Sequence, residues 1–122
     1  MYTAATEIVF QTGHYLTFDH HHQETPHRHD WRVRVTVVAE QLDRHGLVFD
    51  FNLLNKLLTQ VAEPLGQVEN INELPPFTEM NPSTENLARY IHDRLQMDLP
   101  ATVRISEVMV WETDCHRAGY QP

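Results

Sequence analysis

The chain has 122 residues, of which 41% are apolar and 21% charged, and its formal net charge is −8 with histidines neutral. This composition excludes a disordered chain and is typical of a single globular domain. The nine Lys and Arg residues form no run, so we expect no nucleic-acid partner. We also expect a cytoplasmic protein with no membrane partner, because no segment resembles a signal peptide or reaches the ~20 apolar residues of a membrane span.

Two β-strands are predicted in the first third of the chain. Residues 5–12, ATEIVFQT, are rich in β-prone residues. Residues 30–40 alternate between the two sides of a strand. One side carries Trp31, Val33, Val35, Val37 and Ala39. The pattern predicts a half-buried strand that lies antiparallel to the first.

Two amphipathic helices are predicted next. The first begins after Asp50, which is a suitable N-cap, and the second begins in NPSTENLARYIHDRL, with Asn81 as N-cap and Pro82 at the first helical position. Apolar residues follow the helical period in both segments. They are Leu53, Leu54, Leu57, Leu58 and Val61 in the first helix, and Leu87, Ala88, Ile91 and Leu95 in the second.

The C-terminal part predicts one long strand and one short strand. In TVRISEVMVWET, Val103 and Ile105 share one parity while Val108 and Val110 share the other. This slip predicts a β-bulge near Glu107, or a break into two pieces. A short fourth strand is predicted in CHRAGY. The element order favours an α+β fold for the single domain 1–122, an antiparallel four-stranded sheet with two helices on one face.

Three of the nine histidines are candidates for a metal site. His27 and His29 are two residues apart in a strand and therefore share a face. His14 ends the first strand and lies near the start of the second if the two are antiparallel neighbours. Three imidazoles with an open fourth position are the ligands of a catalytic zinc, although iron, nickel and copper accept them too. The alternative is a histidine-rich surface without a metal.

The other histidines offer no comparable pattern. His20, His21 and His22 are consecutive and fall in the predicted connecting loop, where we expect a solvated run. The remaining histidines have no visible partner in the sequence, and we expect each at the surface. They are His45, His92 and His116.

Six motifs, in this order and spacing, resemble the 6-pyruvoyl-tetrahydropterin synthase and 6-carboxy-tetrahydropterin synthase family, which comprises pterin enzymes of the tunnelling fold. The likeness runs over nearly the whole chain. The motifs are FQTGHYL, HRH, GLVFDF, INE, NPSTENLARYI and WET.

The resemblance implies a catalytic Zn²⁺ on His14, His27 and His29. It also implies that Glu112 anchors a pterin ring, helped by Ser83 and Thr84. The family fold is β-β-α-α-β-β, and it assembles into homotrimers, whose sheets close a barrel, or into homohexamers. Both expectations are physically sensible, because a carboxylate suits a planar pair of N–H donors and barrel closure removes exposed sheet edges.

This chain departs from the family at its acid–base residues. Gln23 stands where many members carry a cysteine, and an amide has no basic form near neutral pH. Gln67 and Val68 stand where the family has an Asp-His pair. A branch of the family uses a glutamate in E-x-x-H-G-H instead, and Glu24 has that spacing. Glu24 is therefore the candidate base, and Glu69 is a weaker second candidate.

We therefore hypothesise a zinc-dependent lyase that acts on the side chain of 7,8-dihydroneopterin triphosphate or a similar dihydropterin. Arg28, in place of the middle glycine of H-G-H, favours an anionic tail such as a triphosphate on the substrate, or instead pairs with Asp19 or Glu24. The main alternative is a catalytically degenerate protein that keeps the zinc and binds a pterin or purine-like ring without converting it. A different reaction on a similar bicyclic substrate is a third alternative. Cys115, three residues after Glu112, is expected to be an ordinary C-terminal cysteine.

Overall fold

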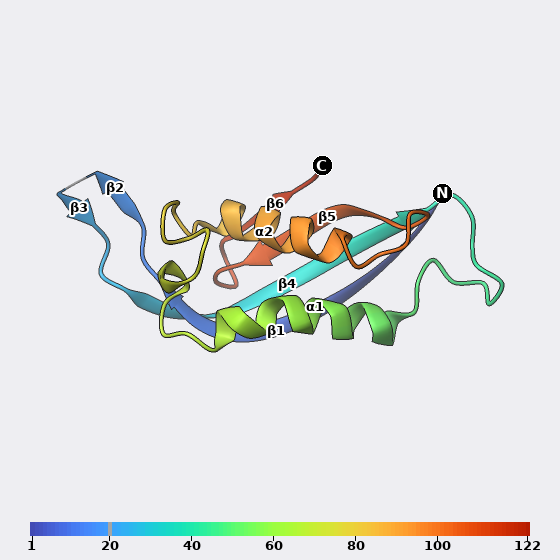
Figure 1. The fold of residues 1–122 in the computed structure, drawn as a ribbon, viewed down its shortest axis with the longest axis horizontal. Helices are drawn as coiled ribbons and strands as arrows, with labels where there is room; N and C mark the ends of the chain where they lie inside the picture. The colour runs from blue at the N-terminus through green and yellow to red at the C-terminus, as the bar shows by residue number, and fades with distance from the viewer. Residues whose placement is uncertain (20) are drawn as a thin grey trace.

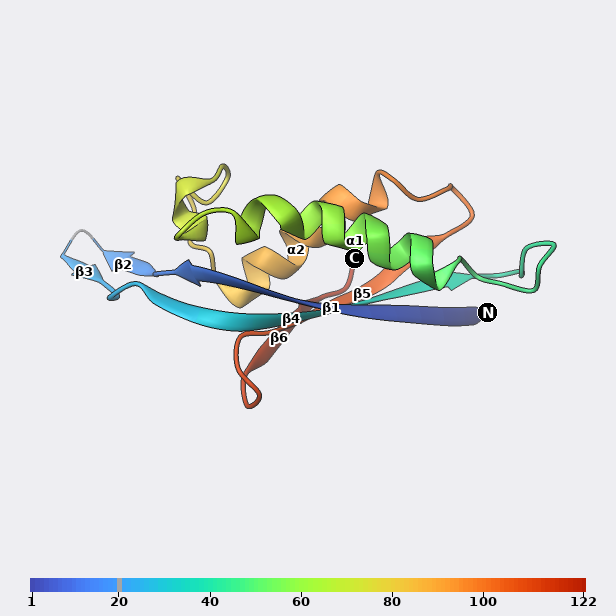
Figure 2. The ribbon, with the colours of Figure 1, turned by 90° about the horizontal axis from the view of Figure 1, so that it is seen from below.

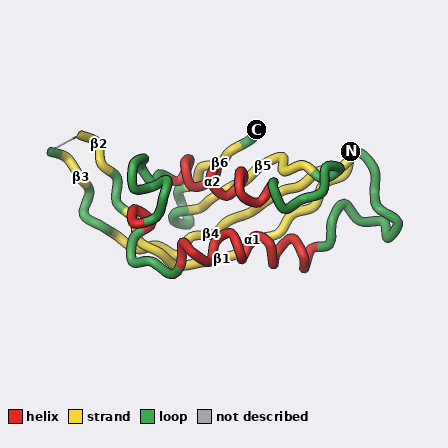
Figure 3. The backbone as a smooth tube through the Cα atoms, in the orientation of Figure 1, coloured by secondary structure: helices red, strands yellow, loops and turns green. Residues whose placement is uncertain are grey.

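The computed structural model describes residues 1–19 and 21–122. Its main sheet is antiparallel, with the strand order β1-β4-β5-β6. These strands are β1 (Tyr2–His14), β4 (His27–Ala39), β5 (Arg104–Trp111) and β6 (Arg117–Tyr120). Helices α1 (Phe51–Gly66) and α2 (Thr84–Gln96) both lie on one face of the sheet (Figures 1 and 2). The predicted α+β architecture is therefore confirmed, and Figure 3 shows how its helices and strands alternate with loops.

Strands β1 and β4 form a ribbon that is paired over its full length, from Tyr2 opposite Ala39 to His14 opposite His27. The predicted alternation is confirmed. Trp31, Val33, Val35 and Val37 are fully buried under the helices. Arg32 and Arg34 point to the other face. Since a slip of one residue would exchange the two faces, this burial fixes the register.

Strand β5 contains the predicted irregularity. Thr36 pairs with Glu107 but the next residue, Val37, pairs with Ile105, so Ser106 is an extra residue in the ladder. The bulge near Glu107 is therefore confirmed, and it explains the change of parity. The four apolar residues on both sides of the bulge are buried. They are Val103, Ile105, Val108 and Val110.

Helix α1 begins as predicted, with the Asp50 carboxylate accepting hydrogen bonds from the backbone N–H groups of Asn52 and Leu53. Its buried residues are Leu54, Leu58, Ala62 and Leu65. Leu53, which the helical spacing had grouped with the apolar stripe, is 45% exposed. It lies about 100° around the helix from Leu54, outside the stripe that faces the sheet.

Helix α2 begins two residues later than predicted. Its N-cap is Ser83, whose hydroxyl accepts a hydrogen bond from the Asn86 N–H at 3.1 Å. The prediction of Asn81 as N-cap and Pro82 as the first helical residue is wrong, because the Asn81 side chain instead pairs with both backbone groups of Thr17, at 2.9 and 3.0 Å. The predicted apolar stripe is confirmed. Leu87, Ala88, Ile91 and Leu95 are fully buried.

Three short elements lie outside the predicted set. Strands β2 (Thr17–Asp19) and β3 (His22–Gln23) form a hairpin where the sequence predicted only a loop, and it projects beyond the main sheet (Figure 1). A 3-10 helix, η1 (Ile71–Glu73), follows α1. The described part of the chain has no helix that is both long and apolar enough to span a bilayer.

The predicted surface exposure of the remaining histidines is only partly confirmed. His21 and His22 are exposed, while His20 lies outside the described residues. His45 and His116 are exposed as predicted. The prediction for His92 is wrong: it is only 9% exposed, because its ring packs edge-on against Tyr120 with the ring centroids 5.0 Å apart.

Candidate functional site

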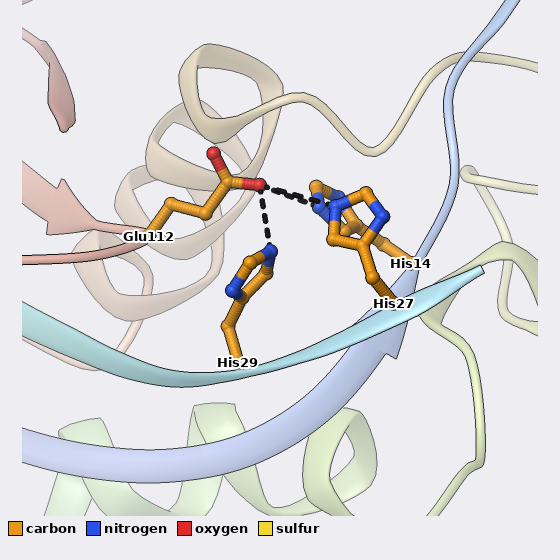
Figure 4. A group of neighbouring side chains, drawn as sticks. All are labelled: His14, His27, His29 and Glu112. Atoms are coloured by element: carbon orange, nitrogen blue, oxygen red, sulfur yellow. Dashed lines mark hydrogen bonds and ion pairs between the residues drawn. The ribbon is translucent and has the colours of Figure 1, made fainter. Parts of the chain in front are cut away.

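The three candidate histidines converge where β1 ends and β4 begins. His14 and His27 are direct cross-strand partners, and His29 follows on the same face of β4. Glu112, the residue after β5, reaches the same point from the neighbouring strand (Figure 4). The predicted convergence of the histidines is confirmed, and the described residues form one metal-competent group, His14, His27, His29 and Glu112.

One carboxylate oxygen faces all three imidazoles. Glu112 Oε1 lies 2.7 Å from His14 Nε2, 3.1 Å from His29 Nε2 and 3.6 Å from His27 Nε2. All four ligand atoms lie within 4.8 Å of one another. The group can therefore surround a single ion with only small side-chain movements.

Backbone carbonyls fix the orientation of two of the imidazoles. His14 Nδ1 lies 2.8 Å from the Pro82 carbonyl oxygen, and His27 Nδ1 lies 3.1 Å from the Thr25 carbonyl oxygen. A carbonyl only accepts, so each Nδ1 carries the proton. In the neutral imidazole, Nε2 then presents a lone pair to the centre of the group. This is the usual arrangement around metal-binding histidines.

His29 is the least satisfied member of the group. Its Nε2 atom is buried and has no assigned hydrogen-bond partner among the described residues, although Glu112 Oε1 lies 3.1 Å away. Burial lowers the pKa of His29 below its ordinary value; the Glu112 carboxylate opposes this shift, and His27 and His14 add to it. His29 is thus neutral at neutral pH, which is the form that binds a metal.

The chemistry of the donor set fits a cation. Imidazole lone pairs and a carboxylate oxygen point at one another. The Nδ1 protons of His14 and His27 are donated to backbone carbonyls outside the group. Such a cluster of acceptors is unfavourable unless a proton or a metal ion lies among them. Imidazole nitrogen and carboxylate oxygen are both common ligands of divalent transition metals. The group could therefore hold a metal ion.

Trp31 packs against two of the histidines from the core side, a contact that was not predicted from the sequence. Its indole N–H donates to the Thr12 carbonyl at 3.1 Å. Its ring centroid lies 4.8 Å from that of His14 and 5.6 Å from that of His29, edge-on in both cases. The alternation places Trp31 two residues after His29 on the same face, so the sequence did carry this signal.

Glu24, the candidate base, lies at the foot of the β2–β3 hairpin. Its Oε1 accepts a hydrogen bond from the Leu16 N–H at 2.9 Å, and its own N–H donates to the Leu16 carbonyl at 2.9 Å. Two residues separate Glu24 from His27. Oε2 has no hydrogen-bond partner among the described residues.

The predicted ring-binding residues lie beside the group. Ser83 and Thr84 are partly buried and follow Pro82, whose carbonyl binds His14. The Ser83 hydroxyl is engaged as the N-cap of α2. The hydroxyl of Thr84, the first residue of α2, does not serve as a helix cap.

Gln23 lines a cavity of about 420 Å³ between the hairpin and η1, with Tyr15 and Asn72 on its other walls. Gln67 is exposed at the end of α1. The backbone carbonyl of Val68 accepts a hydrogen bond from Thr12. Arg28, Glu69 and Cys115 are all exposed.

Comparison with known sequences finds one family and several relatives. The sequence model of the family described as 6-pyruvoyl tetrahydropterin synthase matches residues 3–122. The 6-pyruvoyl tetrahydrobiopterin synthase of Homo sapiens is 36% identical over 96 residues, which is 78% of this chain but 66% of the human protein, slightly under two thirds of its length. The dihydroneopterin monophosphate aldolase of Pyrococcus furiosus is 33% identical over 89 residues, 73% of this chain and 72% of that protein.

Solved structures show the same fold. The 6-pyruvoyl tetrahydropterin synthase of Caenorhabditis elegans superposes with a TM-score of 0.82 at 19% identity, covering 99% of this chain and 95% of the other. The Plasmodium vivax enzyme in which a catalytic glutamate is replaced by alanine gives a TM-score of 0.75 at 19% identity, covering 100% and 99% of the two chains.

Proposed function

The chain belongs to the 6-pyruvoyl tetrahydropterin synthase family, and from this premise we propose that it is a zinc-dependent lyase that acts on the side chain of a dihydropterin. The observation that carries the proposal is the convergence of three Nε2 atoms on one point, two of them freed for a metal by backbone carbonyls. The expected ligands are His14, His27 and His29. A zinc ion held there supplies Lewis-acid polarisation of a substrate oxygen.

We assign recognition of the ring to Glu112. Its second oxygen, Oε2, has no hydrogen-bond partner among the described residues, and a carboxylate suits the paired N–H donors of a pterin. Thr84 supplies a hydroxyl next to the site, while the Ser83 hydroxyl is held by the N-terminus of α2. Ring binding would draw Glu112 away from the imidazoles, which lie 2.7–3.6 Å from Oε1.

We assign the role of general base to Glu24. Oε1 already accepts the hydrogen bond from the Leu16 N–H, so Oε2 is the oxygen that is available to a substrate proton. The E-x-x-H spacing and the catalytic glutamate of the Plasmodium vivax relative support this assignment. Gln23, at the position of the family cysteine, cannot replace it.

We infer that the reaction is cleavage of the side chain, as in the aldolase relative from Pyrococcus furiosus. Glu24 would take the proton of the 2′-hydroxyl, and the C1′–C2′ bond would break to leave an aldehyde. The electron pair would remain on C1′, conjugated with the ring, and Glu24 would return the proton there. The expected ring product is 6-hydroxymethyl-dihydropterin. The substrate is dihydroneopterin or one of its phosphate esters.

The test is a Glu24→Gln variant, assayed beside wild type with dihydroneopterin, its monophosphate and its triphosphate. Loss of a general base should lower kcat by about 100-fold or more while zinc content stays unchanged. Glu40→Gln, a change at an exposed residue after β4, is the matched control. Full activity in Glu24→Gln would overturn Glu24 as the base.

The second candidate function is a binding protein without turnover. The absence of the family's acid–base residues at Gln23, Gln67 and Val68 favours it. Wild-type protein that contains zinc and binds a dihydropterin, yet turns over none of the three substrates, would establish this alternative.

We also propose that the chain works as a homotrimer or homohexamer. In the single chain, β1 and β6 are the edges of the sheet, and β1 is 13 residues long. Long unpaired edges tend to associate, and closure into a barrel would satisfy them.

A further inference from the structure

We propose that Arg32, Arg34 and Arg117, gathered around Trp111 on the sheet face opposite the helices, form a binding site for a phosphate-bearing anion. This arginine cluster is separate from the histidine group and does not depend on the function proposed above. Trp111 directly precedes Glu112 in the chain, but strand alternation sends the two side chains to opposite faces. The cluster therefore lies behind the candidate metal site.

Sheet register brings the arginines together. Trp111 pairs with Arg32 on β4 and with Arg117 on β6, and Arg34 lies two residues beyond Arg32 on the same face. The guanidinium carbons of Arg32, Arg34 and Arg117 lie 4.0, 5.0 and 5.7 Å from the centre of the indole ring. No helix in the described part of the chain covers this face (Figure 2), yet Trp111 is only 6% exposed. Its coverage by the arginine side chains is a cation–π arrangement.

The cluster has surplus positive charge and free hydrogen-bond donors. Glu7 is the only carboxylate among the described residues that forms an ion pair with it: Arg34 Nε donates to Glu7 Oε2 at 2.7 Å, and Arg32 Nη1 lies 3.8 Å from Glu7 Oε1, too far for a hydrogen bond. Arg117 has no ion-pair partner among the described residues. Three of the nine basic residues thus meet at one indole in a chain of net charge −8.

The geometry favours a multivalent phosphate. When a guanidinium stacks on an aromatic ring, the N–H donors of the guanidinium still point outward from its own edge. Two of these donors can bind two oxygens of one phosphate. Stacking also fixes the side chains before binding, which reduces the entropy lost when a ligand arrives. A single carboxylate, Glu7, already occupies part of the site and leaves two positive charges unbalanced. An anion with more than one negative charge would balance them.

The experiment titrates purified full-length protein with inorganic triphosphate at low salt by calorimetry. We expect saturable binding that weakens as salt rises. Arg32→Gln and Arg117→Gln should each weaken binding by about tenfold, since each removes a charged hydrogen-bonding group. Arg44→Gln, an exposed arginine in the loop before α1, is the matched control and should bind as wild type does. Thermal unfolding of each variant checks that it is folded.

The Glu7→Gln variant distinguishes an anion-binding cluster from a structural one. It removes the carboxylate that competes for Arg34, so triphosphate should bind more tightly than to wild type. An arginine cluster with a purely structural role would not give this gain. The proposal would be overturned if triphosphate showed no saturable binding to wild type. That result is expected if a second copy of the chain covers this face. The proposal would also be overturned by binding that is unchanged in the arginine variants, or by binding that His29→Ala abolishes, because the anion would then lie at the histidine group.

Discussion

At the scale of single residues, the candidate site depends on which nitrogen of each histidine faces its centre. The carbonyls of Pro82 and Thr25 hold the Nδ1 protons of His14 and His27, so that Nε2 is available without rearrangement. Trp31 limits the rotation of two rings from the core side. Such outer contacts raise metal affinity because the ligands are oriented before the ion arrives.

Replacing His29 should remove the metal. His29→Ala deletes the buried Nε2, which has no hydrogen-bond partner among the described residues, so zinc per chain after dialysis should fall well below the wild-type value, measured by elemental analysis. His45→Ala, at an exposed histidine outside the group, should retain the wild-type zinc content. Equal zinc in wild type and His29→Ala would contradict the three-histidine site.

Replacing Glu112 should weaken ring binding more than metal binding. Glu112→Gln loses one acceptor oxygen and the charge, which costs about 1.5–3 kcal/mol for a charge-assisted hydrogen bond. The dissociation constant for a dihydropterin, measured by fluorescence titration, should therefore rise by about tenfold or more. Glu107→Gln, at the bulge of β5, is the control. An unchanged dissociation constant in Glu112→Gln would remove this residue from ring recognition.

At the scale of secondary-structure elements, close backbone approaches bring the site together. The η1 region meets the end of β1 through a hydrogen bond from the Gly13 N–H to the Glu69 carbonyl, at 3.0 Å, and a bridge between Gly13 and Asn70. The start of α2 meets the same point through Pro82. The elements on both sides of His14 are thus fixed by contacts with its immediate neighbours.

Gly13 should tolerate no side chain. A Cβ atom there would lie 2.6 Å from both Asn70 Oδ1 and the Glu69 carbonyl oxygen, so Gly13→Ala should lower the free energy of unfolding by about 1–3 kcal/mol, measured with denaturant. Gly66→Ala is the control, since its Cβ would meet only the Gln11 carbonyl oxygen at 3.7 Å. Equal stability of the two variants would show that the approach at Gly13 relaxes at little cost.

At the scale of the whole molecule, the open edges of the sheet predict assembly. The mass in solution, measured by light scattering after size exclusion, should be three or six times the 14.3 kDa of one chain. The physical reason is that β1 and β6 are the edge strands of the sheet, and among the described residues no further strand pairs with their outer sides. A monomer at micromolar concentration would contradict the prediction.

The four strands of the main sheet, the two α-helices and the metal-ligand candidates could all be predicted from the sequence alone. Alternation from Trp31 to Ala39 and the change of parity after Ile105 predicted β4 and the bulge correctly, because side-chain period and burial are local properties of a strand. The same period put His27 and His29 on one face. The motif order predicted the family, which the family match confirms.

Competition between distant groups for hydrogen-bond and packing partners became visible only in the folded chain. Asn81 looked like an N-cap, but Thr17, far away in the sequence, takes its side chain, and Ser83 caps α2 instead. His92 is buried because β6 brings Tyr120 against it. The imidazole orientation likewise depends on the Pro82 carbonyl, 68 residues from His14. Hydrogen bonds and ring contacts across such separations depend on packing between elements, which no local pattern in the sequence records.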